Sequence, residues 1–418
     1  MIADMQRARQ LAWELPKLGW EVEVLVPSTE YQPVTCVDQD STGFFSPDSR
    51  VHYVPEMWPR LFRIAGVGSI GWRALLPLRF VGKRLLQQRH FDLIYISTAH
   101  FPLFLLGPTW QRQFGVPYVL DLHDPLYKEG SRHPVWARPR FKHRVSNALT
   151  KHLEEHVATW AQGLIAVSPN YIGTLRQRHE AKQPAWLRPG RCDAIPFSAL
   201  PQDLCEAAAG LASNPKRNGP PYRIVYVGVG GSVMARSFTL FSRALSRLRM
   251  RSGSLCEGIR VELFGTMLGW QPGEARALAD IAAKWGISDL VREEPGRLSY
   301  RRSLERLLQS DGALIFGVED AGYMPSKLFN YALSGKPLLA TLHCEGPAFL
   351  MFRNIRDLGH ALWIGQNDDM PLEEAVNVLE TFVREVVARK IFERSSNLIP
   401  YLATAMARRH VELFEACL

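Results

Sequence analysis

Hydrophobic and polar residues follow two alternating periods along this chain, and they predict helices and strands in turn. Leu11, Leu15 and Leu18 share one side of a helix predicted from Asp4 to Leu18, which Gly19 would end. An apolar run at 21–27 then predicts a strand. Further strands are predicted at 51–54, 91–97, 117–121 and 163–168, and helices up to about Arg89, at 101–114 and at 141–160. Strands that alternate with helices indicate βαβ units and a parallel sheet.

The second half of the chain restarts the same pattern after a break. Residues 198–221 are predicted to be a linker, since 214–221 is rich in Pro, Gly and Asn and has no apolar period. Strands are then predicted at 222–228, 260–265, 312–316 and 337–340, and a last helix at about 397–414. A length of 418 residues suits two domains. We therefore expect two α/β domains of similar architecture.

Composition excludes several classes of protein. With 46% hydrophobic and 22% charged residues, the chain is typical of a globular protein. No apolar run is long enough to cross a bilayer and no signal peptide is recognisable, so we expect a cytoplasmic protein. The six cysteines have neither CxxC nor Cys/His ligand spacing, which predicts reduced thiols and no metal site.

Positive charge is concentrated in the first half. The chain carries a formal net charge of +9, and residues 57–151 alone contain fifteen basic and four acidic residues. This excess predicts an anionic partner. A solvated basic face with no partner is the alternative.

The basic stretch at 57–89 is also rich in aromatic and aliphatic residues. Such a mixture on a helical segment suits the surface of an anionic membrane, or an acceptor held there. The residues proposed for this membrane or acceptor patch are Arg60, Arg63, Trp72, Arg73, Arg79, Lys83 and Arg84. The alternative is that the aromatic residues belong to the core, with the arginines outside. No nucleic-acid-binding motif occurs, so we expect no nucleic-acid partner.

The segment 312–340 combines a strand, a loop, a helix and another strand. The helix is predicted to begin near Pro325 and to end at Gly335. In an open α/β sheet, ligands lie outside the carboxyl ends of the strands, and helix N-termini there attract phosphate. Lys327 lies near the start of the predicted helix, where the helix dipole disfavours a cation, so it indicates a bound anion.

Two further loops at strand ends contain candidate residues. The glycine-rich turn 228–232, which includes Gly230 and Gly231, follows a strand and would let backbone N–H groups approach a phosphate, with Arg236 nearby. His123 follows the strand at 117–121, in the run Asp-Leu-His-Asp-Pro. A histidine at such a strand end is placed to face a ligand, although a loop histidine bonded to Asp124 is the alternative.

The segment at 325–340 closely resembles the donor-sugar motif of GT-B-fold glycosyltransferases, notably the retaining family-4 type. That motif has proline, any residue, lysine, two residues, glutamate and tyrosine, and then glycine-lysine-proline. The Asp-Leu-His-Asp-Pro turn and the strand at 165–168 carry the resemblance further. It implies a GT-B fold, with two Rossmann-like doubly wound domains, a deep interdomain cleft, and the usual first strand of the N-terminal domain missing.

The resemblance also implies a domain division. Residues 1–200 would form the acceptor-side domain, 201–221 the linker, and 222–396 the nucleotide-sugar-binding domain. Residues 397–418 would cross back to the first domain as a helix. Donor binding would fall to Gly230, Gly231, Arg236, Glu319, Lys327 and Asn330, and His123 would contact the transferred sugar.

The motif departs from the family at two places. Gly322 and Asn330 stand where the family has two glutamates, the second of which normally binds the ribose hydroxyls. Asn330 keeps the capacity to form hydrogen bonds but not the charge. Glu319 lies just upstream and would replace the first carboxylate.

The expected activity is metal-independent transfer of a hexose-type unit from a nucleotide-diphosphate sugar. The acceptor would be a glycan or a lipid-linked glycan in surface polysaccharide synthesis, with no cofactor, by a protein that is cytoplasmic or peripheral at the inner face of the membrane. A non-catalytic GT-B scaffold subunit of a glycan-assembly complex is one alternative, which the altered motif favours. A nucleotide-sugar epimerase is another.

Overall fold

The computed structural model describes residues 3–28, 45, 49–57, 69–127, 140–211, 219–267, 274 and 276–418. The chain divides into two compact units. The N-terminal unit comprises residues 2–32, 45–196 and 406–418, and the C-terminal unit is built from residues 197–405. Each unit has its own parallel sheet, so the α/β prediction is confirmed.

The N-terminal unit contains one pair of strands and one four-stranded sheet. Strands β1 (Glu23–Pro27) and β2 (Arg50–Val54) are parallel to each other. The larger sheet has the order β3-β4-β5-β6, from Ile94–Thr98, Tyr118–Leu122, Gly163–Ala166 and Cys192–Ala194. The helices are α1 (Ala3–Glu14), α3 (Ile70–Gln88), α4 (Leu106–Phe114), α5 (Arg140–Trp160) and α6 (Pro169–His179).

The end of the chain completes the core of this unit. Helix α16 spans Ala403–Cys417, and its residues from Met406 onward belong to the N-terminal unit. Leu413 and Phe414 of α16 are buried with Leu11 and Leu15 of α1 and with Val119 of β4. The apolar side of α16 therefore covers the N-terminal sheet.

The C-terminal unit has a six-stranded parallel sheet with the order β12-β11-β10-β7-β8-β9. The strands are β7 (Tyr222–Val227), β8 (Ile259–Phe264), β9 (Val291–Glu294), β10 (Gly312–Phe316), β11 (Leu338–His343) and β12 (His360–Ile364). The main helices are α7 (Pro201–Gly210), α8 (Ala235–Arg251), α9 (Gly253–Glu257), α10 (Ala277–Lys284), α11 (Tyr300–Leu308), α12 (Leu328–Leu333), α13 (Pro347–Asn354), α14 (Leu372–Val387) and α15 (Ser395–Leu398).

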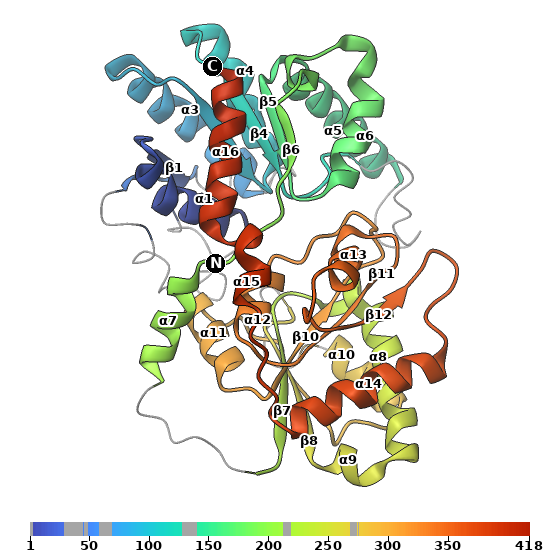
Figure 1. The fold of residues 1–418 in the computed structure, drawn as a ribbon. Helices are drawn as coiled ribbons and strands as arrows, with labels where there is room; N and C mark the ends of the chain where they lie inside the picture. Colours follow the sequence, from blue (N-terminus) through green and yellow to red (C-terminus); the bar gives the residue numbers. More distant parts are fainter. Residues whose placement is uncertain are drawn as a thin grey trace. The chain divides into compact units, whose positions relative to one another are not determined.

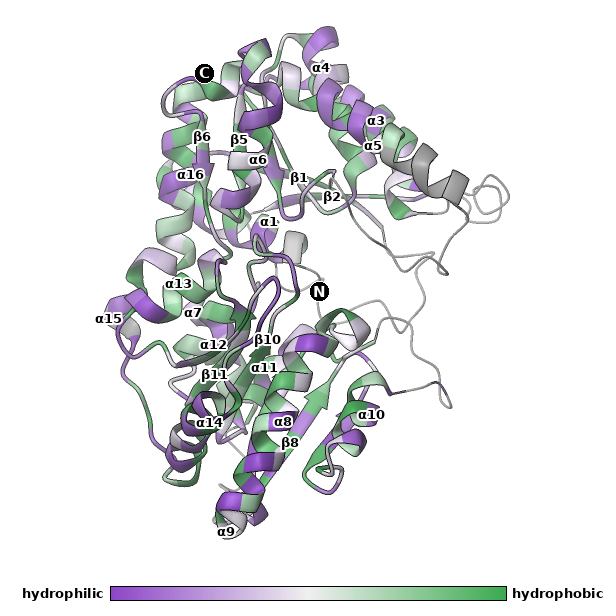
Figure 2. Cartoon of the chain, turned by 90° about the vertical axis from the view of Figure 1, so that its right-hand side faces the viewer, coloured by the Kyte–Doolittle hydropathy of each residue, from purple (hydrophilic) through white to green (hydrophobic). Residues whose placement is uncertain are grey.

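Helices cover both faces of this sheet. Apolar residues of α8, α10 and α14 form one core cluster with the strands, and in Figure 1 α7 and α11 lie on the other side of β7. Figure 2 shows apolar strands inside each unit, between helices whose residues alternate in hydropathy. Strands that are buried on both faces read as continuous apolar runs, which is why β10 and β11 were recognisable in the sequence.

Two segments differ from the sequence-based expectation. The predicted linker contains helix α7, which begins at Pro201 and packs through Asp203 against Tyr300 of α11. Helix α12 begins at Leu328 rather than at Pro325 and has only six residues, so Lys327 is its N-cap residue. Both helices have contacts with residues that are distant in the sequence, Asp203 of α7 with Tyr300 and Tyr331 of α12 with Val227.

Candidate functional site

The carboxyl end of β7 is the topological switch point of the C-terminal unit. From β7 the chain adds β8 and β9 on one side, and then β10, β11 and β12 on the other. The loops after β7 and β10 therefore diverge and leave room for a ligand at that end of the sheet. The predicted donor residues lie in these loops or at the start of the helices that follow them.

Lys327 reaches back from the start of α12 to the end of β7. Its Nζ donates a hydrogen bond to the Val227 carbonyl oxygen at 2.9 Å and lies 4.0 Å from the centroid of the Tyr226 ring. Tyr331, one turn further along, receives a hydrogen bond from the Val227 backbone N–H at 3.0 Å. These bonds fix α12 against β7 and hold the lysine at the switch point.

Lys327 is a half-buried cation, and no ion pair between it and a carboxylate is found among the residues that the structure describes. Burial, together with the nearby Arg297, lowers its pKa to about 7. The charged form of an amine is destabilised when it is removed from water without a counter-ion. An anion that binds beside it stabilises the charged form. Anion binding by Lys327 stays a prediction, and it no longer rests on a helix dipole, because α12 has only six residues.

The glycine-rich loop brings its backbone close to that ammonium. Gly228 has φ +141°, a conformation that strains any other residue, and a β-carbon there would displace the Lys327 Nζ. The Gly228 and Gly230 N–H groups donate to the carbonyl oxygens of Phe264 and Thr266, at 2.8 and 3.0 Å. Gly230 therefore shapes the loop, while Gly231 (φ +51°) opens the turn into α8.

Arg236 is already paired with acidic groups. Its Nη2 lies 2.9 Å from the Asp369 carboxylate and its Nη1 lies 3.7 Å from the Glu319 carboxylate. Nη2 also donates to the Asp368 carbonyl oxygen at 3.3 Å. The two predicted donor residues Arg236 and Glu319 are thus brought together, but as partners of each other.

Asn330 points into the protein. It is 3% exposed, and its Nδ2 donates to the Tyr300 hydroxyl at 3.1 Å, which in turn donates to Asp203 at 2.8 Å. Its Oδ1 is buried without a hydrogen-bond partner among the described residues. The side chain therefore ties α12 to α11 and, through Tyr300, to α7.

His123 lies in the N-terminal unit, within a buried polar network at the carboxyl ends of β3 and β4. Its Nε2 is 2.8 Å from the Asp121 carboxylate and 3.0 Å from the Ser97 Oγ. Asp121 also accepts hydrogen bonds from the Tyr95 hydroxyl at 2.6 Å and from Arg7 at 3.0 Å. The Nε2 edge of His123 therefore faces the interior, where Asp121 and Ser97 fix the orientation of the ring.

Helices from both ends of the chain meet in this network. Arg7 of α1 has a fully buried ion pair with Asp121, and His410 of α16 lies 3.3 Å from the Tyr95 hydroxyl. Burial raises the pKa of Asp121, but Arg7 and then His123 outweigh it and hold that pKa well below its usual range. Burial, followed by the charge of Arg7, lowers the pKa of His410 to about 4. The network thus contains a charged Arg7–Asp121 pair beside a neutral His410.

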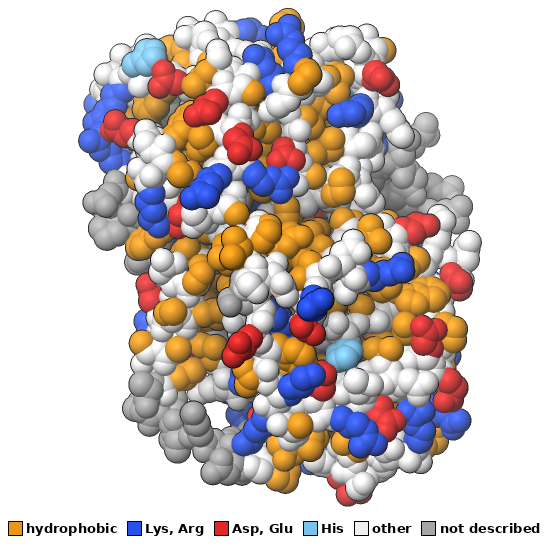
Figure 3. Space-filling model, in the orientation of Figure 1, with side chains coloured by type: hydrophobic (Ala, Val, Ile, Leu, Met, Phe, Trp, Pro, Cys, Tyr) orange, Lys and Arg blue, Asp and Glu red, His pale blue; other side chains and the backbone are white. Residues whose placement is uncertain are grey.

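The predicted membrane or acceptor patch is only partly at the surface. Arg79, Lys83 and Arg84 are exposed on α3, and basic side chains gather on the part of the surface where Figure 1 places α3 (Figure 3). Trp72 is half-buried, and Arg73 is 8% exposed because its guanidinium pairs with Glu56 at 2.6 Å.

The patch also includes residues that the structure does not describe, since the predicted positions Arg60 and Arg63 lie outside the described residues. Leu76 and Phe80, which are 43% and 69% exposed, stand beside the three exposed cations of α3. The exposed face of α3 therefore combines apolar and basic side chains.

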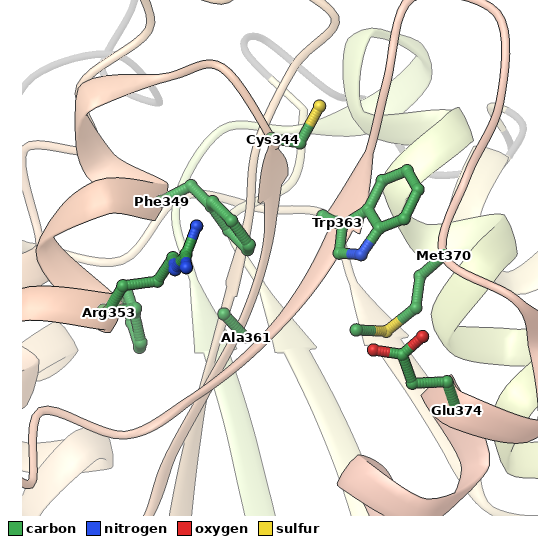
Figure 4. A pocket seen from close by; sticks show the side chains of 8 residues that line it. Cys344, Phe349, Arg353, Ala361, Trp363, Met370 and Glu374 are labelled. Carbon is green, nitrogen blue, oxygen red and sulfur yellow. The ribbon is translucent and has the colours of Figure 1, made fainter.

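A separate pocket of about 390 Å³ lies beside the edge strand β12 (Figure 4). It is lined by Cys344, Phe349, Phe352, Arg353, Ala361, Trp363, Met370 and Glu374. None of the predicted donor residues lines it. It flanks the sheet rather than the switch point.

Sequence reasoning missed residues that the switch point brings together. Tyr226 and Tyr331 pack around the Lys327 ammonium, and Arg297, in the loop after β9, lies close enough to shift its pKa. The buried tyrosines resemble ordinary core residues in the sequence, and Arg297 lies 30 positions from Lys327 with no shared motif. A glycine before Arg297 was the only local signal.

Two further observations apply to the residues that the structure describes. No group of three or more His, Cys, Asp or Glu side chains in this part of the chain is arranged to hold a metal ion. Among the helices that the structure describes, none combines the length and apolar character needed to cross a membrane.

The sequence is similar to one protein-family model and to a curated relative. Residues 5–189 match the family model described as glycosyl transferase 4-like domain. A curated relative, D-inositol 3-phosphate glycosyltransferase of Salinispora arenicola, is 29% identical over 210 residues, which cover 49% of this chain and 44% of that protein. The aligned part of the chain therefore spans less than half the length of this relative.

Solved structures share the architecture over nearly the whole chain. Sucrose-phosphate synthase from Thermosynechococcus elongatus has a TM-score of 0.61 at 13% identity, covering 97% of this chain and 91% of that one. Anabaena HepE in complex with UDP-glucose has a TM-score of 0.56 at 13% identity, covering 99% and 96%. A trehalose-phosphate synthase from Burkholderia vietnamiensis has a TM-score of 0.58 at 10% identity, covering 94% and 99%. At such identities the likeness establishes a shared fold.

Proposed function

We propose that this chain, a GT-B-fold protein whose residues 5–189 match the glycosyl transferase 4-like family model, transfers a hexose from a nucleotide-diphosphate sugar to a glycan or lipid-linked acceptor. The observation that carries this proposal is the uncompensated Lys327 ammonium at the switch point of the C-terminal sheet. A solved structure of the same fold, Anabaena HepE, holds UDP-glucose. The transfer would retain the anomeric configuration and would need no metal ion.

The chemistry of the reaction suits the groups present. When the bond between the anomeric carbon and the diphosphate breaks, negative charge develops on the leaving phosphate oxygens. Lys327 stabilises this charge, and because its environment is dry the interaction is stronger than in water. Gly231 and Gly228 allow the loop to approach the phosphates closely.

Two further residues receive roles in this proposal. The Asn330 Oδ1 accepts a hydrogen bond from a ribose hydroxyl, a role that in the family belongs to glutamate. His123, whose ring is held by Asp121 and Ser97, would contact the transferred sugar. In both roles the residue orients the ligand through non-covalent contacts and forms no covalent bond to it.

Calorimetric titration with UDP-, GDP- and dTDP-sugars tests the donor. We expect one of them to bind, and we expect slow release of free sugar and nucleotide without an acceptor. Lys327→Met should weaken binding of that donor by about tenfold or more, the usual effect of losing a charge-assisted hydrogen bond. NMR of the transferred sugar then reports whether the anomeric configuration is retained.

Failure to bind any of the three nucleotide sugars would contradict the proposal. Equal affinity and turnover of the Lys327→Met variant would remove Lys327 from the site. The melting temperature of the variant serves as the control for folding.

A non-catalytic donor-binding protein is a second candidate, favoured by Asn330. The neutral amide stands where the family has a carboxylate, and its Nδ2 donates to the Tyr300 hydroxyl, which donates to Asp203. Binding of a nucleotide sugar without hydrolysis or transfer would support this reading. Restoration of turnover by Asn330→Glu would identify the lost carboxylate as the cause.

We also propose that α3 docks on an anionic membrane, where a lipid-linked acceptor of surface polysaccharide synthesis would be found. The support is the exposed face that combines Leu76 and Phe80 with Arg79, Lys83 and Arg84. Each cation near an anionic surface contributes about 1 kcal/mol, and the apolar residues enter the interface. Sedimentation with vesicles of phosphatidylcholine, with and without phosphatidylglycerol, measures this binding.

The docking test includes a variant and a control. We expect binding only to the vesicles that contain phosphatidylglycerol, and loss of binding in the Phe80→Ser/Lys83→Gln/Arg84→Gln variant. The triple change Arg247→Gln/Arg251→Gln/Met250→Ser, on the exposed end of α8, is the matched control. Binding that is the same for both variants would contradict a role of α3.

A further inference from the structure

The pocket beside β12 contains none of the predicted donor residues, and no sequence motif marks it. Phe349 and Arg353 of α13 lie on one side of it, and Trp363 and Glu374 lie on the other, with Ala361 of β12 between them (Figure 4). Ala361 contributes only a methyl group, which leaves the space between the larger side chains open. The volume of about 390 Å³ is within the range of about 300–1,000 Å³ that small-molecule sites have.

Backbone hydrogen bonds fix one wall of this pocket. The Met370 N–H donates to the Trp363 carbonyl oxygen at 3.0 Å, and the Gly365 N–H donates to the Asp368 carbonyl oxygen at 2.7 Å, so the segment after β12 folds back along the strand. Arg236 of α8 also donates to the Asp368 carbonyl oxygen, at 3.3 Å. The wall is therefore a fixed part of the fold, as is usual for a binding pocket.

The inside of the pocket is apolar and its rim is charged. Met370 is 7% exposed, whereas Phe349 and Trp363 are half-buried and offer ring surface to the pocket. Arg353 and Glu374 are exposed at the rim. Among the residues that the structure describes, neither of these charged side chains has a hydrogen bond or an ion pair, and the same holds for the indole N–H of Trp363. The pocket therefore combines aromatic surface with donors and acceptors that the described protein does not use.

The lining indicates the chemical class of the ligand. Arg353 and Glu374 have opposite charges, so a ligand with a net charge would be attracted by one of them and repelled by the other. A wholly apolar ligand would remove polar groups from water without giving them a partner, which is unfavourable. A sugar ring is neutral, has apolar C–H faces that pack on aromatic rings, and carries hydroxyl groups that both donate and accept hydrogen bonds.

We propose that this pocket binds a neutral sugar unit of a glycan, with its ring against Trp363 and Phe349 and its hydroxyl groups bonded to Arg353 and Glu374. The site is separate from the proposed donor site and goes beyond the proposed function, which does not need it. For a transferase that acts on glycans, a second glycan site would keep the acceptor close to the protein between transfers.

Saturation-transfer NMR of the full chain with the neutral trisaccharides maltotriose, cellotriose, mannotriose and triacetylchitotriose tests the inference. We expect at least one to bind, and Trp363→Ala to weaken its binding by about tenfold, since a central aromatic side chain contributes strongly to a site. Ala361→Leu should weaken binding as much by filling the pocket, and its melting temperature should not fall, because the added atoms enter open space. Leu350→Ala, at an α13 residue that is 47% exposed and does not line the pocket, is the matched control and should bind as the wild type does.

Benzoate and benzylamine are the rival probes, since each is aromatic and carries one charge. If none of the trisaccharides binds, or if either Trp363→Ala or Ala361→Leu binds them as the wild type does, the inference is wrong. If benzoate or benzylamine binds in their place and loses affinity in these two variants, the pocket takes a charged ligand and the inference is likewise overturned. Titration with nucleotide sugars tests the proposed function separately, so either can fail while the other stands.

Discussion

At the scale of single residues, the chemistry of the site depends on the environment of Lys327. Burial and Arg297 lower its pKa to about 7, whereas the pKa values of Tyr226 and Tyr331, which pack nearby, are raised by burial. Tyr226 and Tyr331 therefore stay neutral while the lysine titrates. Tyr323 also contributes to the raised pKa of Tyr331.

This titration predicts that donor binding depends on pH. Below about pH 7 the ammonium is already charged, whereas above it the ligand must draw a proton onto Lys327, since an anion raises the pKa of a neighbouring amine. Affinity for the nucleotide sugar should therefore fall between about pH 7 and 9, by up to about tenfold per unit. Calorimetry in two buffers of different ionisation enthalpy should show proton uptake at pH 8, and Lys327→Met should show none.

The same shift has a consequence for stability. Because the folded-state pKa lies below the unfolded value, the unfolded chain binds more protons between about pH 7 and 10.4, and the contribution of this group to stability rises with pH in that window. The wild type should therefore gain stability relative to Lys327→Met as the pH is raised from 7 to 9. A constant difference in the urea midpoint would contradict the shifted pKa.

Gly228 gives a second prediction at this scale. Gly228→Ala should displace the Lys327 ammonium, because the new β-carbon would overlap with its Nζ and because φ +141° is strained for alanine. We expect loss of donor affinity of about tenfold or more together with some loss of stability. Gly253→Ala, at a glycine with no atom within 4 Å of the new β-carbon, is the matched control, and equal affinity of the two variants would contradict the prediction.

At the scale of elements, buried polar contacts fix helices to strand ends. Arg7 of α1 pairs with Asp121 of β4 and also donates to the Ile195 carbonyl oxygen at 2.6 Å. Replacement of one partner in such a pair leaves a buried charge without a counter-ion. This destabilises the fold more than replacement of both partners does. Helix α1 is therefore held to the sheet by electrostatics as well as by Leu11 and Leu15.

Arg7→Met should lower the free energy of unfolding by about 3–5 kcal/mol at pH 7, as measured by urea denaturation. In the wild type the low pKa of Asp121 stabilises the fold above about pH 4, the unfolded value, and this contribution is lost as the pH falls below it. The variant can protonate Asp121, so its deficit should shrink on acidification. Lys182→Met, at an exposed pair with Glu155, is the matched control and should leave the urea midpoint close to that of the wild type.

At the scale of the whole molecule, the N-terminal unit is assembled from distant parts of the chain. Residues from Met406 onward pack on residues near the start, and Phe414 lies 5.6 Å from the Trp20 ring and 5.3 Å from the Tyr95 ring, measured between centroids. The unit is therefore complete only after the C-terminal unit has been synthesised. Its stability should depend on the last turns of α16.

Phe414→Ala should cost about 3–5 kcal/mol, the usual effect of removing a buried aromatic ring. Leu418→Ala, at a residue that is 63% exposed, should cost under about 0.5 kcal/mol. Thermal unfolding followed by near-ultraviolet circular dichroism compares the two. Equal melting temperatures would show that α16 does not contribute to the core of the N-terminal unit.

The sequence by itself determined the local features of this protein. The periods of apolar residues placed most strands and helices within a few residues, since a side chain facing a core repeats every two or 3.6 positions. The order of those elements indicated parallel sheets, and the run at 325–340 placed a lysine after β10. These properties depend on neighbours in the chain and can be read along it.

Only the tertiary structure decided which side chains meet. Arg7 and Asp121 are 114 positions apart, and no sequence motif indicates that they form a pair. Arg73, Arg236 and Asn330 were interpreted as surface or ligand-binding residues, yet they pair with Glu56, with Asp369 and with Tyr300. The packing of helices against the sheet decides which charged side chains come together. Because many residues contribute to the free energy of this packing, the sequence identifies the charged residues but not their partners.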